Sequence, residues 1–400
     1  MSTTTYDARG GMRNVWIITA AMTVLAICYT MIIPFLPIYL LELGVPKADV
    51  ALWSGLVFGI TFLIAGIMAP IWGKIADNKG KKRMALRAGF AIAICYVLIG
   101  LVTDQYQLLM GRALVGFANG FYPAAMTMVS LSVDEKQVGR ALGIFQTGLI
   151  LGNVIGPFLG GAVESVVGMR PVFYVSGIAV FIATLAVLFF VKEPAQPTQP
   201  TKSTSLREDF KAVQQQPVLV RLLWIFFFMQ CAIMMLQPIL ALYVGDMQGT
   251  MEGAAMISGT ILSIGGLAGS LTTNLWVRLG ERRGYFKTIS YCMMGSGIVL
   301  LLQSLPVGIW WFGVLQVLIG SCIVGINPSL SAAVTLNTDP SFRGRMFGMT
   351  TTAQQFGSMV GPVFASIVST YIGISYVFSI TGLLLLYMAF QSRKLSAKHE

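Results

Sequence analysis

The sequence predicts an all-α, polytopic membrane protein with twelve transmembrane helices in two pseudo-symmetric six-helix bundles. Of its 400 residues, 56% are hydrophobic and only 11% are charged, whereas soluble domains are about 25% charged. Apolar runs of the roughly 20 residues that a bilayer requires recur from one end of the chain to the other. In addition, residues of the first half recur in the second half at a nearly constant spacing.

The apolar runs form two groups of six on either side of a polar stretch. We expect transmembrane spans near 15–41, 52–75, 84–103, 106–131, 141–164 and 171–191, then 221–245, 255–277, 287–305, 309–335, 346–370 and 374–391. The polar stretch is rich in proline, serine and threonine and has a short amphipathic segment, which is typical of a tether with a surface helix. We therefore expect an N-terminal bundle over 1–191, a cytoplasmic linker over 192–220 and a C-terminal bundle over 221–400.

The positive charge indicates the orientation of the chain. A net charge of +11 would suggest a nucleic-acid ligand if it were clustered on one surface. With both termini in the cytoplasm, however, every lysine and arginine except Lys47, Arg112 and Arg170 falls in an inward-facing segment, as the positive-inside rule requires. We therefore expect no nucleic-acid partner. The first apolar run is too long for a secretory signal, so it should remain as an uncleaved anchor.

Motifs for metal, nucleotide and disulfide chemistry are missing from the sequence. The five cysteines all fall within predicted spans and lack the spacing of metal ligands, so we interpret them as small packing residues. No Gly-x-x-x-x-Gly-Lys-Ser/Thr run occurs, so coupling to ATP hydrolysis is unsupported. We expect no enzymatic activity, no metal and no cofactor, and any energy that the protein uses should come from an ion gradient.

The two halves of the chain match at an offset of about 204 residues. The matched pairs are Pro34 with Pro238, Tyr39 with Tyr243, Trp72 with Trp276, Asp77 with Glu281, Gly80 with Gly284, Gly116 with Gly320, Arg140 with Arg345 and Pro157 with Pro362. Agreement at one offset across so many spans indicates a duplicated six-helix unit, as transporters often have.

The fifth span carries glycine at every fourth position, at Gly152, Gly156 and Gly160, followed by Gly161. This spacing places three glycines on one helical face, where the backbone of a neighbouring helix can approach closely. Pro157 removes a backbone donor in the middle of the span, so we expect a kink there. A glycine-lined bend is what a rocking helix interface requires.

Three motifs resemble those of the major facilitator superfamily. The first resembles the superfamily's loop between helices two and three, and its residues are Gly73, Asp77, Gly80, Lys81 and Arg83. Arg112 with Gly116 resembles the second motif, and residues 152–161 match the antiporter motif Gly-x-x-x-Gly-Pro-x-x-Gly-Gly at every fixed position. The resemblance covers the whole chain, and it is closest to the twelve-helix bacterial drug/proton antiporters.

Asp77 is a candidate gating residue at the cytoplasmic end of the second span. The repeat suggests that it faces the N-terminus of helix eleven, near Arg345, where the helix dipole would stabilise its charge. Such a contact forms only when the cytoplasmic side is closed, so the resemblance implies a latch for the outward-open state, with Glu281 as a weaker counterpart beside Arg140. The alternative is a loop carboxylate that offsets its basic neighbours.

Arg112 is the one basic residue placed inside the bilayer, where a charge costs at least about 2.5 kcal/mol at the helix centre. We interpret it as facing the central cavity, either in proton coupling or in binding an acceptor on the substrate. Because it lies near the outer end of its span, snorkelling to the outer headgroups is the alternative. Its counterpart in the repeat is the neutral Gln316.

Proton coupling needs a group whose pKa differs between the inward-open and the outward-open state of the transporter. Many antiporters of this kind carry a carboxylate deep in a central helix, but all 16 acidic residues here lie in loops or near helix ends. Glu164, near the outer end of the fifth span, is our candidate, with solvation at the surface as the alternative.

The resemblance implies that helices one, four, seven and ten line the substrate cavity. Uncharged polar side chains at membrane depth usually face protein or water, and eight of them in these helices or beside them are candidates for substrate binding. They are Tyr29, Asn119, Tyr122, Gln146, Gln230, Gln237, Asn327 and Gln354. Hydrogen bonding between helices is the alternative role for each.

The sequence thus predicts proton-coupled export of lipophilic small molecules, drugs among them, by alternating access, in a monomer embedded in the bacterial cytoplasmic membrane. One alternative is an exporter of a specific metabolite, a siderophore or an amphipathic anion. Another is a membrane sensor or scaffold that transports nothing; the intact motifs in both interface helices argue against it.

Overall fold

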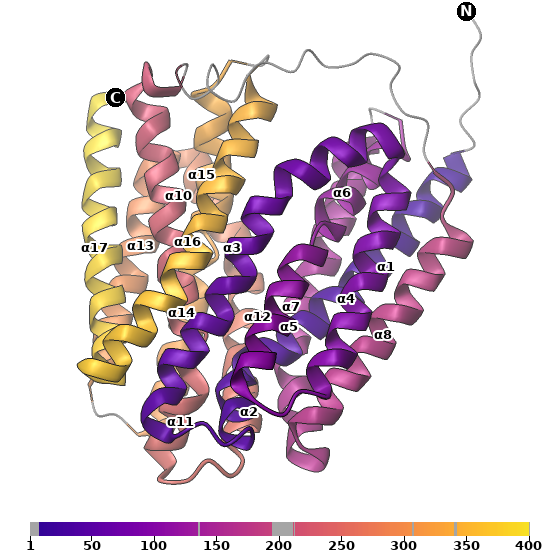
Figure 1. Ribbon diagram of the computed structural model, residues 1–400. Coiled ribbons are helices and arrows are strands. Elements are labelled where there is room, and N and C mark those ends of the chain that lie inside the picture. Colours follow the sequence, from indigo (N-terminus) through magenta and orange to yellow (C-terminus); the bar gives the residue numbers. More distant parts are fainter. Residues whose placement is uncertain are drawn as a thin grey trace, which may run out of the picture.

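The computed structural model describes residues 8–134, 137–193, 211, 213–305, 308–339 and 342–399. Within these helices, the side chains at 8–10, 33, 70, 74, 77, 78, 344 and 396–399 are outside the description. The described chain is built from helices without strands (Figure 1). The expected all-α membrane fold is therefore confirmed. Most of the linker lies outside the described residues, including the expected amphipathic stretch near 206–213 except for Lys211 and Val213.

The N-terminal bundle has its own apolar core. Its helices are α1 (Ala8–Ile32), the 3₁₀ turn η1 (Ile33–Phe35), α2 (Leu36–Glu42), α3 (Lys47–Lys79), α4 (Lys81–Gly100), α5 (Gln105–Ala118), α6 (Phe121–Leu131), α7 (Val138–Val167) and α8 (Met169–Phe190).

The C-terminal bundle has a second apolar core. Its helices are α10 (Pro217–Leu236), α11 (Leu240–Gln248), α12 (Ala254–Arg283), α13 (Tyr285–Gln303), α14 (Ile309–Ile323), α15 (Ile326–Leu336), α16 (Arg343–Tyr371) and α17 (Ile374–His399). This bundle begins at Pro217, four residues before the expected span, because proline is well suited to the first turn of a helix.

Eleven described segments are long and apolar enough to cross a membrane. The twelfth expected span, 346–370, falls in α16, which has 29 residues. At a rise of about 1.5 Å per residue, its length exceeds the roughly 30 Å of the hydrocarbon core. Its many threonine, glutamine and glycine residues lower its hydropathy, and these residues are suited to an interface helix.

Four of the expected spans are each broken into two helical pieces, which the sequence analysis did not predict. The breaks lie between α1 and α2, α5 and α6, α10 and α11, and α14 and α15. Pro34 and Pro238 occupy two of them, and each lacks the N–H that would continue the backbone ladder. Gly120 follows α5 with a φ of +134°, a conformation that favours glycine.

The internal repeat is visible in matching hydrogen bonds. The Tyr39 hydroxyl donates to the Ile99 carbonyl at 2.9 Å, and the Tyr243 hydroxyl donates to the Gln303 carbonyl at 3.2 Å. Likewise, the indole of Trp72 donates to the Phe117 carbonyl at 2.8 Å, and that of Trp276 to the Ser321 carbonyl at 2.6 Å. Both pairs keep the spacing of about 204 residues that relates the two halves.

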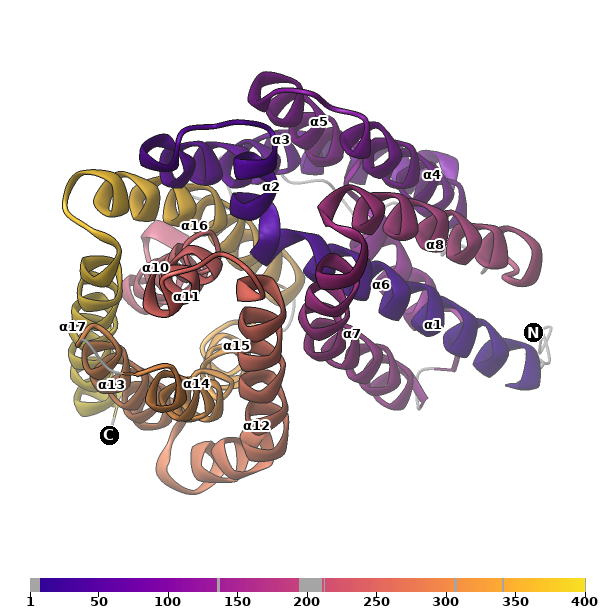
Figure 2. The same ribbon diagram turned by 90° about the horizontal axis from the view of Figure 1, so that it is seen from below.

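The bundles meet through two helix pairs, α3 with α16 and α7 with α12. We call the side where α17 ends the terminal face, at the top of Figure 1, and the opposite side the distal face. The bundles converge toward the distal face and diverge toward the terminal face (Figure 1). Seen from the distal face, the helices of the C-terminal bundle form a ring, and α3 and α7 of the N-terminal bundle lie beside α16 and α12 of that ring (Figure 2).

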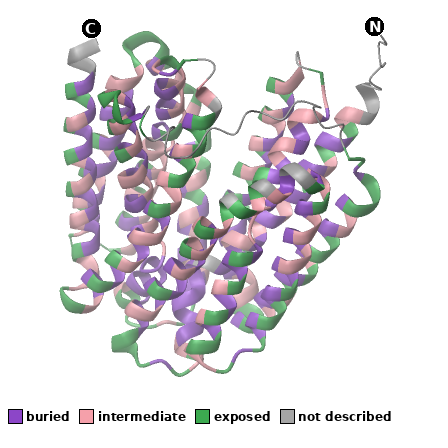
Figure 3. Cartoon of the chain, turned by 45° about the horizontal axis from the view of Figure 1, so that its top comes forward, coloured by how far each residue is buried: buried purple, intermediate pink, exposed green. Residues whose placement is uncertain are grey.

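The glycines of the interface helices agree with this shape. Near the distal face, an added side chain at Gly55 of α3 would collide with Pro362 and Ser366 of α16. Toward the terminal face, no atom lies within 4 Å of the position that a Cβ would take at Gly73 of α3 or Gly143 of α7. Within each bundle, buried residues face inward and exposed ones cover the outside (Figure 3). The structure is therefore closed at the distal face and open at the terminal face.

Candidate functional site

Each bundle contains one hydrogen-bonded pair of polar side chains that the sequence analysis had singled out. In the N-terminal bundle, the Gln146 amide of α7 donates to the Tyr122 hydroxyl of α6 at 3.2 Å. In the C-terminal bundle, the Gln354 amide of α16 donates to the Asn327 side-chain oxygen of α15 at 3.2 Å. All four residues were expected to bind substrate. They lie in the half of the molecule where the bundles diverge, and none of the four is buried.

The other four expected binding residues are spread over both bundles. Tyr29 of α1 is half-buried, and Gln230 of α10 lies against α16, where an added side chain at Gly357 would contact it. Gln237 occupies the break between α10 and α11. Asn119 occupies the break between α5 and α6, where its side-chain oxygen accepts the Gly120 N–H at 2.7 Å. The structure therefore does not bring these four together.

Arg87 stabilises the break between α5 and α6, a role that the sequence analysis missed. Its guanidinium donates to the carbonyls of Ala118 and Asn119 at 3.3 and 3.0 Å and lies 3.6 Å from the centre of the Trp72 ring. A cation at the end of a helix complements the helix dipole and its free carbonyls. The sequence placed Arg87 among the charges that orient the chain, but its contacts are with the protein.

Arg112 lies inside the N-terminal bundle, so neither expected location of its side chain is observed, while its expected role in proton coupling or substrate binding stays a prediction. Its side chain has no exposed surface, so it neither snorkels to headgroups nor faces the open space between the bundles. Tyr29 of α1 and Tyr96 of α4 are its neighbours. None of its guanidinium nitrogens has a hydrogen-bond partner among the described residues. A buried charge without a partner is costly, which points to a functional reason for keeping it.

The antiporter motif packs on two helices at once. An added side chain at Gly152, Gly156 or Gly160 would collide with α1, which belongs to the same bundle, whereas one at Gly161 would collide with α12 of the other bundle. The close approach expected for the glycine face is thus mainly within the N-terminal bundle. α7 is one helix from Val138 to Val167 with Pro157 inside it.

A hydrogen bond joins this motif to the opposite bundle. The backbone N–H of Phe158 donates to the Ser263 hydroxyl of α12 at 3.1 Å. In addition, an added side chain at Gly259 of α12 would collide with the Pro157 carbonyl. α12 is therefore the helix of the opposite bundle that the antiporter motif contacts.

The loop motif after α3 lies on the terminal face. Gly80 links α3 to α4 with a φ of +96°, and the Glu193 carboxylate accepts the Lys82 backbone N–H at 3.0 Å at the start of α4. Arg83, Arg140 and Glu281 are exposed. The side chain of Asp77 lies outside the described residues, so the expected latch stays a prediction.

An acidic pair lies on the distal face. The Glu42 and Glu164 carboxylates are close enough for their negative charges to interact. Burial raises the pKa of the Glu42 carboxyl, an effect that the Met169 backbone N–H and the Arg170 charge partly offset. Among the described residues, no group of three or more potential ligands could hold a metal ion.

Comparisons with known proteins agree with this arrangement. The family model described as Major Facilitator Superfamily matches residues 18–302 and 258–395. The chain is 33% identical over 371 residues to "Multidrug resistance protein MdtG" of Proteus mirabilis, covering 92% of each protein, and 33% identical over 365 residues to the protein of that name from Citrobacter koseri, covering 91% of this chain and 90% of the relative.

Solved transporter structures share the fold. A bacterial homologue of the human lysosomal transporter Spinster, in an inward-facing and unoccupied conformation, superposes with a TM-score of 0.74 at 17% identity, covering 98% of this chain and 97% of that one. The nucleoside transporter NupG superposes with a TM-score of 0.78 at 15% identity, covering 95% of this chain and 99% of that one.

Proposed function

The chain belongs to the major facilitator superfamily, and we propose that it exports lipophilic small molecules, drugs among them, from the bacterial cytoplasm in exchange for protons. Its multidrug-resistance relatives extend over about nine-tenths of its length, which supports drugs as the cargo.

We infer the class of substrate from the chemistry of the two polar pairs. Tyr122 with Gln146 and Asn327 with Gln354 present amides and a hydroxyl without a charge. Sparse uncharged donors and acceptors suit neutral or weakly polar molecules, because a strongly charged substrate would need an opposite charge when it leaves water.

The positive-inside rule supports a cytoplasmic terminal face, with both termini in the cytoplasm. The structure would then be the inward-open state, ready to take a substrate from the cytoplasm or the inner leaflet. Rocking of the bundles about α7 and α12 would close the terminal face and open the distal face, in the manner of alternating access.

For the proton, the candidates are Glu164 and its neighbour Glu42 on the distal face. Two interacting carboxylates favour uptake of a shared proton, and this face would meet the more acidic side of the membrane. Protonation of either carboxylate would weaken the repulsion between Glu42 and Glu164. The packing of the ends of α2 and α7 at the distal face would then depend on whether the proton is bound.

Arg112 supports a second candidate substrate, an amphipathic anion or a specific acidic metabolite. A buried guanidinium without a partner among the described residues could pair with a carboxylate or sulfonate that enters the N-terminal bundle. The remaining alternative is a function other than transport, as a membrane scaffold or sensor.

The test is transport by the purified protein in liposomes with an imposed pH gradient. Hoechst 33342 and the uncharged dye Nile red represent lipophilic substrates, and 8-anilinonaphthalene-1-sulfonate represents an amphipathic anion. We expect uptake of the two dyes that requires the gradient and releases protons in return. Uptake of the sulfonate alone would support the second candidate, and no uptake of any compound would favour the scaffold.

A further inference from the structure

The two bundles are related by the internal repeat, but their interiors differ at one place. In the N-terminal bundle, Arg112, Tyr29 and Tyr96 are neighbours. At an offset of 204 residues, their counterparts in the C-terminal bundle are Gln316, Ile233 and Leu300. Each counterpart is smaller, so the same helical framework encloses less side-chain volume in the C-terminal bundle. Packing that is dense in one bundle should therefore leave space in the other.

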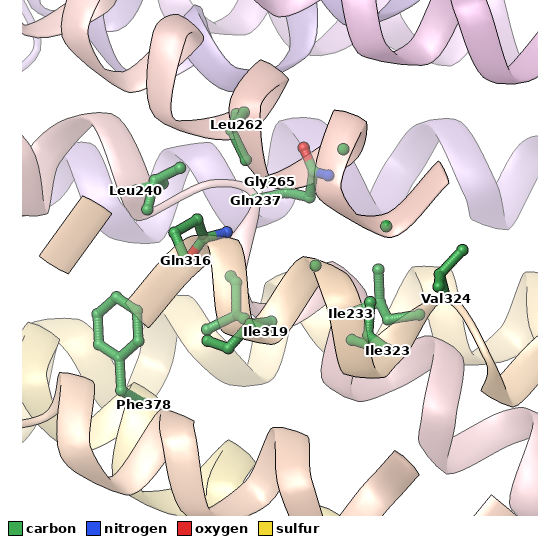
Figure 4. Close-up of a pocket in the computed structure, with 14 residues that line it drawn as sticks. Ile233, Gln237, Leu240, Leu262, Gly265, Gln316, Ile319, Ile323, Val324 and Phe378 are labelled. Carbon is green, nitrogen blue, oxygen red and sulfur yellow. The ribbon is translucent and has the colours of Figure 1, made fainter. Parts of the chain in front are cut away.

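A cavity of about 260 Å³ lies at this place in the C-terminal bundle. Ile233 and Gln316, two of the three smaller residues, line it (Figure 4). The remaining walls come from the break after α10, from α12 and from α14, and Phe378 of α17 closes one side. The cavity is larger than the roughly 150 Å³ that holds a benzene ring in a protein core.

Two glutamine amides supply the polar groups of the cavity, while the other lining residues are apolar or glycine. Gln316 accepts a hydrogen bond from the Gln303 amide at 3.0 Å through its oxygen, which leaves its own amide nitrogen to donate. Gln237 makes no hydrogen bond to another residue in the described part of the chain and has both a donor and an acceptor to offer. No charged side chain lines the cavity, so an ion would be left without a counter-charge.

We propose that this cavity is a binding site for an uncharged aromatic molecule that carries an amide or carbonyl group, inside the C-terminal bundle and separate from the space between the bundles. The aromatic part fills the apolar walls, and the polar group pairs with Gln237 and Gln316. That such molecules are substrates rests on the export function proposed above. The existence of the site rests only on the cavity and its lining.

The position of the cavity connects it to the bundle interface. Gly265, Gly266 and Gly269 of α12 form one wall, and Gly266 also lies against Val154 of α7, which an added side chain would contact. The same helix holds Ser263, which accepts the Phe158 N–H of the antiporter motif. A ligand pressing on this wall would therefore change how α12 packs against α7.

The probe is 4-benzoylbenzamide, which combines a photoreactive benzophenone with an uncharged amide. The full-length protein is irradiated with the probe, and mass spectrometry maps the modified peptides. We expect modification within 233–240, 262–269 and 316–324, with competition by benzanilide, an unreactive aromatic amide.

Ile233→Tyr is the decisive variant, because it places in the C-terminal bundle the side chain that the N-terminal bundle has at Tyr29. We expect it to fill the cavity and to reduce labelling of these peptides at least about tenfold. Gln237→Met keeps the size of the side chain but removes its hydrogen bonds, which should weaken probe binding about fivefold. The control, Leu267→Phe at an exposed position of α12 that does not line the cavity, should bind the probe normally.

Labelling confined to the peptides around Tyr122, Gln146, Asn327 and Gln354 would overturn the proposed site while leaving the export function intact. Equal labelling of the Ile233→Tyr and Leu267→Phe variants would overturn it as well, because it would mean that the probe partitions from the lipid. Conversely, specific labelling of the cavity by a protein that moves no dye in liposomes would support the site and contradict the export function.

Discussion

Lys47 at the start of α3 and Asp246 in α11 form an ion pair of 3.0 Å that joins the two bundles at the distal face. Both side chains are substantially exposed, at 69% and 43%, and exposed pairs typically contribute about 0.2–1 kcal/mol. The pair can form only while the bundles meet at this face, so it favours the state that is open at the terminal face.

Loss of this pair should shift the bundles toward opening at the distal face. We expect Asp246→Asn to increase the open fraction up to about fivefold, in line with 1 kcal/mol. Spin labels at the outer ends of α3 and α11 would measure it by double electron–electron resonance. The double variant Lys47→Asp with Asp246→Lys should return the distribution to that of the parent protein. If all three proteins give the same distances, the pair has no part in gating.

Glycine substitutions in α7 should have effects that depend on position. Gly156→Ala should reduce transport at least tenfold, because the new methyl group would collide with Thr30 and the Ile27 carbonyl and overpacking costs about 1–3 kcal/mol. Gly156→Leu should abolish transport while the protein still inserts in the membrane. Gly143→Ala is the matched control, since it has open space. Equal transport by the two alanine variants would show that close packing of the motif is dispensable.

Removal of the Arg112 charge should leave the thermal stability of the protein intact but abolish the coupling of transport to protons. We expect Arg112→Gln, which copies its counterpart Gln316, to match or exceed the thermal stability of the parent, because a buried charge without a partner is destabilising. We also expect dye uptake in liposomes to lose its dependence on the pH gradient. Arg112→Lys serves as the charge-conserving control. A large drop in melting temperature with intact coupling would reverse this assignment.

Glu42 should make stability depend on pH in a defined direction. A raised pKa in the folded state means that the ionised form costs stability. This cost is absent below the ordinary glutamate pKa and grows as the pH rises through the folded pKa. Melting temperatures measured from pH 4 to 8 should therefore decline more steeply with rising pH in the parent than in Glu42→Gln. Parallel curves would show that Glu42 titrates normally.

The proposed latch can be tested on the terminal face, which is open in this structure. If Asp77 holds the N-terminus of α16 when that face closes, Asp77→Asn should lower dye export severalfold and increase the population open at the terminal face. Asp77→Glu should retain part of the activity. Unchanged export by Asp77→Asn would remove the latch from the mechanism.

Features with regular spacing could be predicted from the sequence. The apolar spans and the 204-residue repeat follow from periodicity, and the repeat reappears in the Tyr39 and Tyr243 hydrogen bonds. The two polar pairs also came from expected residues, because amides and hydroxyls at membrane depth must find partners.

Features that depend on packing between distant segments could not be predicted. The cover that Tyr29 and Tyr96 provide for Arg112 requires three helices to be placed in space, and no local pattern encodes it. The same holds for Arg87, which looks like one more charge on the inward side until α5 is seen to end beside it. The breaks had a local signal in Pro34, Pro238 and Gly120, but a membrane helix can also pass through proline, as α7 does at Pro157.

The unequal interiors of the two bundles also have a mechanical consequence. High pressure favours the state of a protein that has the smaller volume, so it acts most strongly on regions that contain empty space. The C-terminal bundle, which holds the 260 Å³ cavity, should therefore be the softer half of the protein, while the bundle filled by Arg112 and its tyrosines should be the stiffer one. We therefore expect the duplicated unit to give one stiffer body and one more compressible body.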